Sequence, residues 1–204
     1  MILSSGLLTL AGCDTVYKEL QRTNGPAAAL DRFRPAFSVA LYSTSVEVVG
    51  NHLSGLLLIK KMPDSTLRMV FSNEMGFKFF DFEFAPDGNF KVYSIIKKMN
   101  RKSVIKTLRK DFELVLMQRL DPSQLTVRQD TAGNRYHIFP QTRGYNCYIT
   151  NAGGNELIRA ERASPSAPIA QYYMGNYVNG IPDTIGITHL NFDFTIALKR
   201  LEQQ

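Results

Sequence analysis

The 204 residues, 44% of them hydrophobic and 21% charged, have the ordinary composition of a globular protein and favour a single domain. A chain of this length buries roughly 70% of its unfolded surface without disulfides, and its two cysteines, Cys13 and Cys147, exclude a disulfide scaffold. The net charge of +6 by itself leaves nucleic acid, an anionic membrane surface and no specific partner as alternatives.

The segment before Cys13 has the pattern of a leader for export. Its apolar stretch Leu7–Ala11 is too short to span a bilayer, which takes ~20 apolar residues, but it suits the core of a signal peptide. Leu10-Ala11-Gly12-Cys13 resembles the lipobox of bacterial lipoproteins. The resemblance implies that residues 1–12 are removed as a lipoprotein signal peptide and that Cys13 is lipidated. The alternative is a buried first element with an incidental cysteine, because the leader lacks the usual Lys or Arg.

Residues 13–35 are predicted to form a lipidated tether and a short helical start, and residues 36–204 to form the domain. Asn24-Gly25-Pro26 interrupts the tether, Ala27–Phe33 can form one or two helical turns, and Pro35 ends them.

The next part of the chain is predicted to be a run of strands separated by turns. The strands are Phe37–Val49, Leu53–Lys61, Leu67–Ser72, Phe77–Phe84 and Phe90–Ile96. Their short connections favour antiparallel neighbours and therefore a meander.

The period of the pattern then changes to that of a helix. Within Asn100–Arg119, the apolar residues Val104, Leu108, Phe112 and Val115 share one face. A second β region is predicted at Leu125–Gln129, Arg135–Phe139, Tyr145–Thr150, Leu157–Arg162 and Ile187–Lys199. Between the last two, Ser164–Asp183 is predicted to be a long apolar loop that either folds over a cavity mouth or is pinned to the core by its tyrosines.

Two predicted strands are apolar on both faces. In the second strand Leu57 and Ile59 point one way, whereas Leu56 and Leu58 point the other; Phe80 and its alternate neighbours line one face of the fourth strand. An antiparallel sheet usually has one face in water, so such strands need cover on both sides. The predicted fold class is therefore α+β, a curved antiparallel sheet, or half-barrel, with a covering helix between two β regions.

This layout resembles the lipoprotein-localisation (Lol) carrier and receptor superfamily from about Phe37 to Leu198. The best local match is the strand and turn Leu67–Gly76. The resemblance implies a half-barrel, a helical lid and an apolar cavity for acyl chains, in a lipid-anchored protein of the cell envelope and its outer membrane. It also implies that Met75, just before Gly76, contacts membrane; the alternative is that Met75 folds back and packs.

The predicted site is accordingly a cavity for acyl chains of a lipid or lipoprotein. Its expected lining residues are Leu56, Leu58, Phe80, Phe82, Val104, Leu108 and Phe112. The helical stripe is expected to pack across the concave face of the sheet, because both surfaces must be buried. The alternative function is a structural or assembly lipoprotein that binds a protein partner and has its interior filled by its own side chains.

Residues that could support catalysis do not form a recognisable motif. The three histidines, His52, His137 and His189, lack the spacing of metal ligands. Asp81 and Glu83 share a strand face and are read as a solvated edge rather than an acid pair, and Cys147 as a packed thiol rather than a nucleophile. We therefore expect no enzyme activity, no cofactor and no metal.

The basic residues gather before and along the predicted helix: Lys97, Lys98, Arg101, Lys102, Lys106, Arg109 and Lys110. They either form the solvated face of an amphipathic helix or dock on anionic headgroups, at ~1 kcal/mol for each basic residue near the surface. Nucleic acid is not expected as a partner, because the leader exports the protein away from it.

Overall fold

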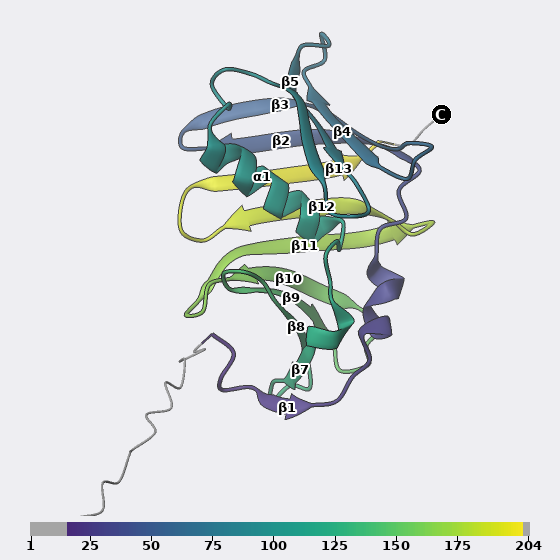
Figure 1. Cartoon of the computed structure of the whole chain (residues 1–204), viewed down its shortest axis with the longest axis vertical. Coiled ribbons are helices and arrows are strands. Elements are labelled where there is room, and N and C mark those ends of the chain that lie inside the picture. Colours follow the sequence, from purple (N-terminus) through teal and green to yellow (C-terminus); the bar gives the residue numbers. More distant parts are fainter. Residues whose placement is uncertain (1–15, 202–204) are drawn as a thin grey trace, which may run out of the picture.

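The computed structural model describes residues 16–201 and contains one antiparallel sheet of 13 strands crossed by an α-helix (Figure 1). The strands are β1 (Gln21–Thr23), β2 (Val39–Val48), β3 (Asn51–Lys61), β4 (Leu67–Ser72), β5 (Lys78–Phe84), β6 (Phe90–Ile95), β7 (Thr126–Gln129), β8 (Arg135–Pro140), β9 (Tyr145–Thr150), β10 (Leu157–Ala163), β11 (Pro168–Val178), β12 (Ile181–His189) and β13 (Phe194–Arg200). The helix α1 spans Lys102–Val115, and two short 3-10 helices span Ala27–Phe33 and Pro122–Gln124. The predicted signal peptide and Cys13 lie outside the described residues.

The order of the strands explains why the helix crosses the sheet. From one edge to the other the order is β1-β7-β8-β9-β10-β11-β12-β13-β2-β3-β4-β5-β6, so the sheet does not close. β6 forms one edge, and β7 lies beside β1 at the other. The chain between β6 and β7 must therefore pass over a face of the sheet, and α1 is that passage. The predicted fold class is confirmed.

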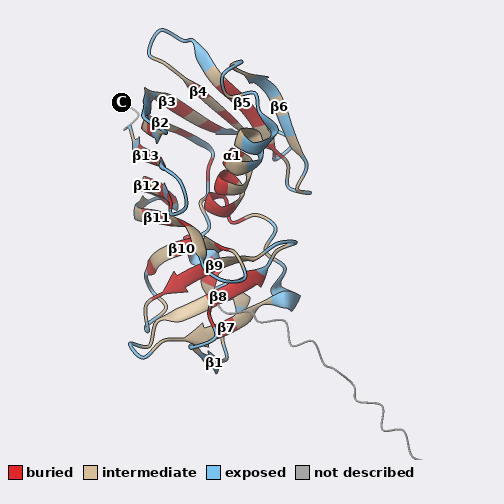
Figure 2. Ribbon diagram, turned by 90° about the vertical axis from the view of Figure 1, so that its left-hand side faces the viewer, coloured by how far each residue is buried: buried red, intermediate tan, exposed pale blue. Residues whose placement is uncertain are grey.

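The main core lies between α1 and the concave face of the curved sheet (Figure 2). Strand alternation sends one set of side chains into it, and Leu57, Phe71 and Phe82 are each at most 1% exposed. From the helix, Leu108 and Phe112 enter the same cluster. The predicted packing of the helical stripe on the concave face is thus present in the structure. Within residues 16–201, no helix is long and apolar enough to cross a bilayer.

A second, smaller cluster covers the other face of β8, β9 and β10. It contains Tyr17 from the N-terminal segment together with Cys147 and Ile149. The Tyr17 hydroxyl donates a hydrogen bond to Glu161 at 3.0 Å. β1 pairs with β7, and Leu30 is 1% exposed in the main core. The structure therefore places much of residues 16–35, expected as a tether and a short helical start, within the folded domain, and the short helix lies at Ala27–Phe33.

The long loop predicted at Ser164–Asp183 is wrong, because this segment contains β11 and the start of β12. Ala170, Tyr172 and Met174 alternate inward, which is a strand pattern. The turn consists of Asn179 and Gly180, whose φ angles are 53° and 74°. An Asn-Gly pair with positive φ at both positions is the favoured two-residue hairpin turn, so the tyrosines belong to a hairpin.

The single strand predicted at Ile187–Lys199 is interrupted. β12 ends at His189 and β13 begins at Phe194. The intervening Leu190 and Phe192 are 50% and 42% exposed and lie in the turn between the two strands, where the Phe192 ring stacks on Phe194 with centroids 5.7 Å apart. The segment lacks the Gly and Pro residues that usually mark a turn, which is why the sequence pattern gave no sign of the break.

Candidate functional site: an apolar pocket beneath the helix

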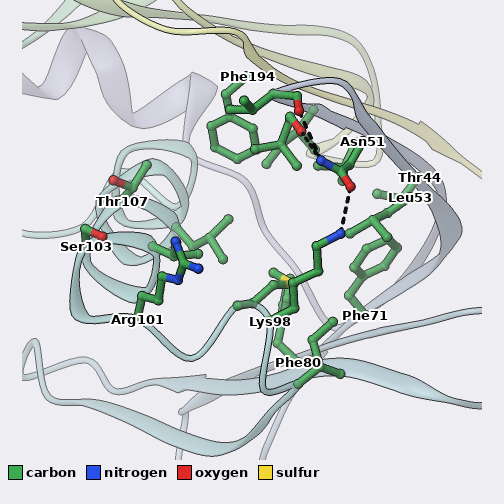
Figure 3. Close-up of a pocket in the computed structure, with 18 of the residues that line it drawn as sticks. Thr44, Asn51, Leu53, Phe71, Phe80, Lys98, Arg101, Ser103, Thr107 and Phe194 are labelled. Carbon is green, nitrogen blue, oxygen red and sulfur yellow. Dashed lines mark hydrogen bonds between the residues drawn. The ribbon is translucent and has the colours of Figure 1, made fainter.

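A pocket of about 480 Å³ lies between the N-terminal half of α1 and the concave face of the sheet (Figure 3). This volume is within the range of small-molecule sites, roughly 300–1,000 Å³. The pocket is lined by Thr44, Val46, Val48, Val49, Asn51, Leu53, Leu57, Phe71, Phe80, Ile96, Lys98, Met99, Arg101, Ser103, Val104, Thr107, Leu108, Phe112, Phe192, Phe194 and Ile196. The lining contains no Asp, Glu, His or Cys.

The sizes of the side chains along β2 explain where the space lies. Tyr42 is fully buried, and its hydroxyl donates a hydrogen bond to the Pro182 carbonyl at 2.6 Å. Further along the same face, the smaller Thr44 and Val46 line the pocket. At the inner end, the rings of Phe80 and Phe112 lie with centroids 6.0 Å apart. The cavity is therefore closed by aromatic rings at depth and widens towards the β2–β3 turn.

Polar side chains gather at the mouth of the pocket. Lys98 Nζ donates a hydrogen bond to Asn51 Oδ1 at 2.7 Å, and Asn51 Nδ2 donates to the Val49 carbonyl at 3.0 Å. Arg101, at the start of α1, lies beside the same opening (Figure 3), and Ser103 is also among the lining residues. Below this rim the walls are apolar, so the site has one polar end and one apolar end.

The turn beside the mouth is strained. Val49 has a φ of 45° and is followed by Gly50 with a φ of 70°. A positive φ is a genuine outlier for a β-branched residue. The Val49 amide donates to the Asp193 carbonyl at 2.9 Å, which ties the β2–β3 turn to the β12–β13 turn. Strained backbone of this kind is concentrated at ligand sites and costs about 1–3 kcal/mol.

The residues predicted to line the cavity divide into three groups. Phe80, Val104, Leu108 and Phe112 line the pocket, although contact with a ligand stays a prediction. Phe82 is fully buried in the main core beside it. Leu56 and Leu58 do not line the pocket, because they alternate with Leu57 and so lie on the opposite face of β3. Since β3 is apolar on both faces, its sequence did not indicate which face was inside.

Met75 lies at the tip of the β4–β5 hairpin and is 93% exposed. The Asn73 side chain accepts hydrogen bonds from the backbone amides of Met75 and Phe77 at 3.1 and 2.8 Å. Phe77 is 58% exposed. The turn is therefore fixed by Asn73 while it presents two large apolar side chains to the surroundings.

A buried polar cluster beneath the C-terminal half of α1 was not predicted. The Asp111 carboxylate, with no exposed surface, accepts hydrogen bonds from Tyr172 Oη at 2.7 Å and His189 Nε2 at 3.0 Å. Arg162 Nη2 lies 3.2 Å from the same carboxylate. None of the four side chains lines the pocket. They join α1 to β10, β11 and β12, and their chemistry is structural.

The other candidate groups are also engaged in structural contacts. Arg68 pairs with both Asp81 and Glu83, and its guanidinium lies 3.4 Å from the centre of the Tyr93 ring. Burial alone would raise the pKa of Asp81, but the hydrogen bonds and charge of Arg68 lower it below its ordinary value. Cys147 is fully buried, and burial raises the pKa of its thiol. Cys147 is therefore a packed thiol, as predicted, whereas Asp81 and Glu83 form an ion-pair network rather than a solvated edge.

No family model and no curated protein sequence matches the chain. Two solved structures resemble it in fold. A DUF1329 family protein from Desulfovibrio piger is 11% identical, with 88% of this chain and 92% of that chain covered and a TM-score of 0.45. A domain from Vibrio parahaemolyticus, described as an outer membrane lipoprotein-sorting protein, is 10% identical, with coverage of 85% and 88% and a TM-score of 0.47. At such identities the likeness concerns the arrangement of the elements alone.

Proposed function

We propose that the protein is a lipid-anchored lipoprotein of the cell envelope whose pocket holds an acyl chain of a lipid or lipoprotein during transfer or sorting. The observation that supports this function is the pocket of about 480 Å³ between α1 and the sheet. Its apolar walls suit a hydrocarbon chain, because each buried methylene contributes ~0.8 kcal/mol. Covalent chemistry is not required for such a role, and the pocket lining contains no Asp, Glu, His or Cys.

The alternative of an assembly lipoprotein without a lipid cavity predicted an interior filled by its own side chains. The open space beneath Val104 and Leu108 favours lipid binding over that alternative. The exposed Met75 and Phe77 support the proposed transfer step, because an apolar hairpin tip can enter the surface of a membrane that gives or receives the lipid. Cys13 is proposed as the site of the lipid anchor, in the outer membrane.

The function can be tested with the full chain carrying Cys13→Ala, purified without detergent. Native mass spectrometry should show a co-purified lipid, and the emptied protein should take up a fluorescent fatty-acyl probe. Val104→Trp places a large ring in the pocket and should abolish uptake. Ile105→Trp is the matched control, since its neighbouring position on α1 does not line the pocket. Absence of both lipid and probe from the unsubstituted pocket would refute the proposal.

A further inference from the structure

The mouth of the pocket carries positive charge without a counter-charge. Lys98 and Arg101 both line the opening, and none of the lining residues is acidic. The hydrogen-bond partner of Lys98 is the neutral amide of Asn51. Among residues 16–201, Arg101 forms no ion pair. Two cations thus stand at the polar end of an otherwise apolar site.

Some basic side chains of α1 itself, Lys102, Lys106 and Lys110, likewise form no ion pair among residues 16–201, but they do not line the pocket, and two others on or beside the helix are paired with carboxylates. Arg109 pairs with Glu113 at 2.7 Å, and Arg162 lies 3.2 Å from Asp111. Lys98 and Arg101 are exposed to water and have no carboxylate partner, so both remain available to an anionic ligand.

The position of Arg101 at the start of the helix is electrostatically unfavourable. Arg101 is the N-cap residue of α1, and the first turn of the helix contains no acidic residue. The positive end of a helix dipole repels a cation placed beside it. A local choice that works against stability is expected where function requires it. An anion bound between Lys98 and Arg101 would be attracted by both cations and by the positive end of the helix.

The hydroxyl groups of Ser103 and Thr107 on α1 add further hydrogen-bond donors to the pocket lining. Ser103 and Thr107 are four positions apart, so they lie on one face of α1, and both are among the residues that line the pocket. A hydroxyl can donate a hydrogen bond to a carboxylate or phosphate oxygen. The rim therefore offers donors of two kinds, charged and neutral, above an apolar interior.

We propose that the ligand is a single-chain amphiphile with an anionic headgroup, a carboxylate or a phosphate, bound with its chain under α1 and its headgroup between Lys98 and Arg101. This inference rests on the proposed function and narrows it to one class of lipid. A volume of about 480 Å³ lies in the lower half of the range for ligand pockets and suits one chain better than the several chains of a lipidated protein.

The test compares amphiphiles with the same palmitoyl or hexadecyl chain and different headgroups, below their micellar concentrations. Palmitate and palmitoyl lysophosphatidic acid supply the two anions, and hexadecanol and monopalmitoylglycerol are neutral. Binding to the full chain with Cys13→Ala, measured by displacement of the fluorescent fatty-acyl probe, should be about tenfold or more tighter for the anions, as charge-assisted hydrogen bonds would give. The two anions together show whether the site prefers carboxylate or phosphate, and inorganic phosphate alone should not displace the probe.

The variant Lys98→Gln/Arg101→Gln should lose the preference for anions and still bind hexadecanol. Both residues are exposed, so the thermal midpoint should not change. Lys106→Gln removes an exposed charge of the same helix that does not line the pocket, and it should keep the preference. Equal affinity for anionic and neutral probes would overturn this inference and leave the proposed function intact, whereas failure of every probe to bind would overturn both. A preference that survives in the double variant, or displacement by phosphate alone, would also overturn the inference.

Discussion

The Asp111 carboxylate on α1 and Nε2 of His189 at the end of β12 lie 3.0 Å apart, and both side chains are almost completely enclosed. A carboxylate can only accept, so Nε2 carries the proton in this pair. Because β6 is one edge strand of the sheet and β7 lies beside the opposite edge strand β1, α1 crosses the concave face between β6 and β7. The Asp111 cluster fixes the C-terminal half of that crossing, whereas the pocket lies under the N-terminal half.

Replacement of Asp111 should therefore be strongly destabilising. Asp111→Ala leaves Arg162 and His189 buried without their partner, and breaking a buried pair in this way costs about 3–5 kcal/mol. Urea denaturation of the variant should show that decrease in the free energy of unfolding. Tyr172→Phe removes one hydrogen bond from the same carboxylate and should cost only about 1 kcal/mol. A loss below 1 kcal/mol for Asp111→Ala would contradict the anchoring role.

His137 should make the stability of the domain depend on pH. Burial, followed by the charge of Arg135, lowers the pKa of His137 from 6.5 to about 4. Between these values the unfolded chain binds a proton that the folded protein excludes, so stability falls as the pH drops from 6.5 to 4. The loss reaches roughly 3 kcal/mol at pH 4 and is absent above pH 6.5.

The contribution of His137 can be isolated with His137→Gln, which does not titrate. Carboxylates contribute equally to both proteins, so the difference between their unfolding free energies should diminish as the pH is lowered through this window. If the unfolding free energies of the two proteins change in parallel from pH 7 to pH 4, His137 is not the group that causes the loss of stability.

Met75→Glu should leave the fold intact and weaken membrane contact. At 93% exposure, the side chain has little packing to lose, so the thermal midpoint should correspond to a change within about 0.5 kcal/mol. Binding of the full chain with Cys13→Ala to phospholipid vesicles should decrease. Val178→Glu alters an exposed apolar residue beside another hairpin turn and should bind vesicles like the parent. A large drop in the midpoint would instead indicate that Met75 packs against the domain.

Cys13→Ala should release the protein from membranes. The pattern Leu10-Ala11-Gly12-Cys13 supports lipidation at this thiol, and two or more acyl chains are sufficient for stable anchoring. Cell fractionation followed by a carbonate wash should leave the unsubstituted protein in the membrane and the variant in the soluble fraction. Cys147→Ala is the control, since that thiol is enclosed in the fold. A variant that remains bound through the wash would rule out the anchor.

The sequence predicted the strands and the helix whose apolar residues recur with a regular period and whose turns contain Gly, Pro, Asn or Asp. β4 was predicted with its observed bounds, and α1 was recognised from the spacing of Val104, Leu108 and Phe112. The Asn179-Gly180 turn was present as a signal but was outweighed by the Pro and Gly residues around it, so β11 was missed. The break between β12 and β13 had no such marker.

The site was predicted only in part, because its residues come from separate strands whose pairing the sequence does not show. Helical spacing identified the roof of the pocket, but the register of β3 was needed to exclude Leu56 and Leu58. Lys98 and Arg101 were seen as members of a basic cluster, and only the path of the chain before α1 places them at the mouth. Asp111 gave no signal, because its partners Arg162, Tyr172 and His189 are 51 to 78 positions away along the chain.

The last prediction concerns motion of α1, whose two halves have different support. Of its 14 residues, those over the pocket are exposed or half-buried up to Thr107, whereas Phe112, Leu114 and Val115 are each at most 2% exposed. Local opening is easiest where few apolar contacts must be broken. Backbone amides at Ile105–Thr107 should therefore exchange with deuterium faster than those at Phe112–Val115. Fraying alone does not produce this asymmetry, because each set lies near one end of the helix.

Ligand should change this pattern in a specific way. Palmitate bound under α1 adds contacts to the half that lacks them, so it should slow exchange at Ile105–Thr107 and leave Phe112–Val115 nearly unchanged. Asp111→Asn, which weakens the anchor, should instead speed exchange in the C-terminal half. Uniform exchange along the helix, with no effect of palmitate, would show that α1 opens as one unit or not at all. In that case access to the pocket would have to come from the turns at its mouth, where the strained Val49 lies, rather than from the helix.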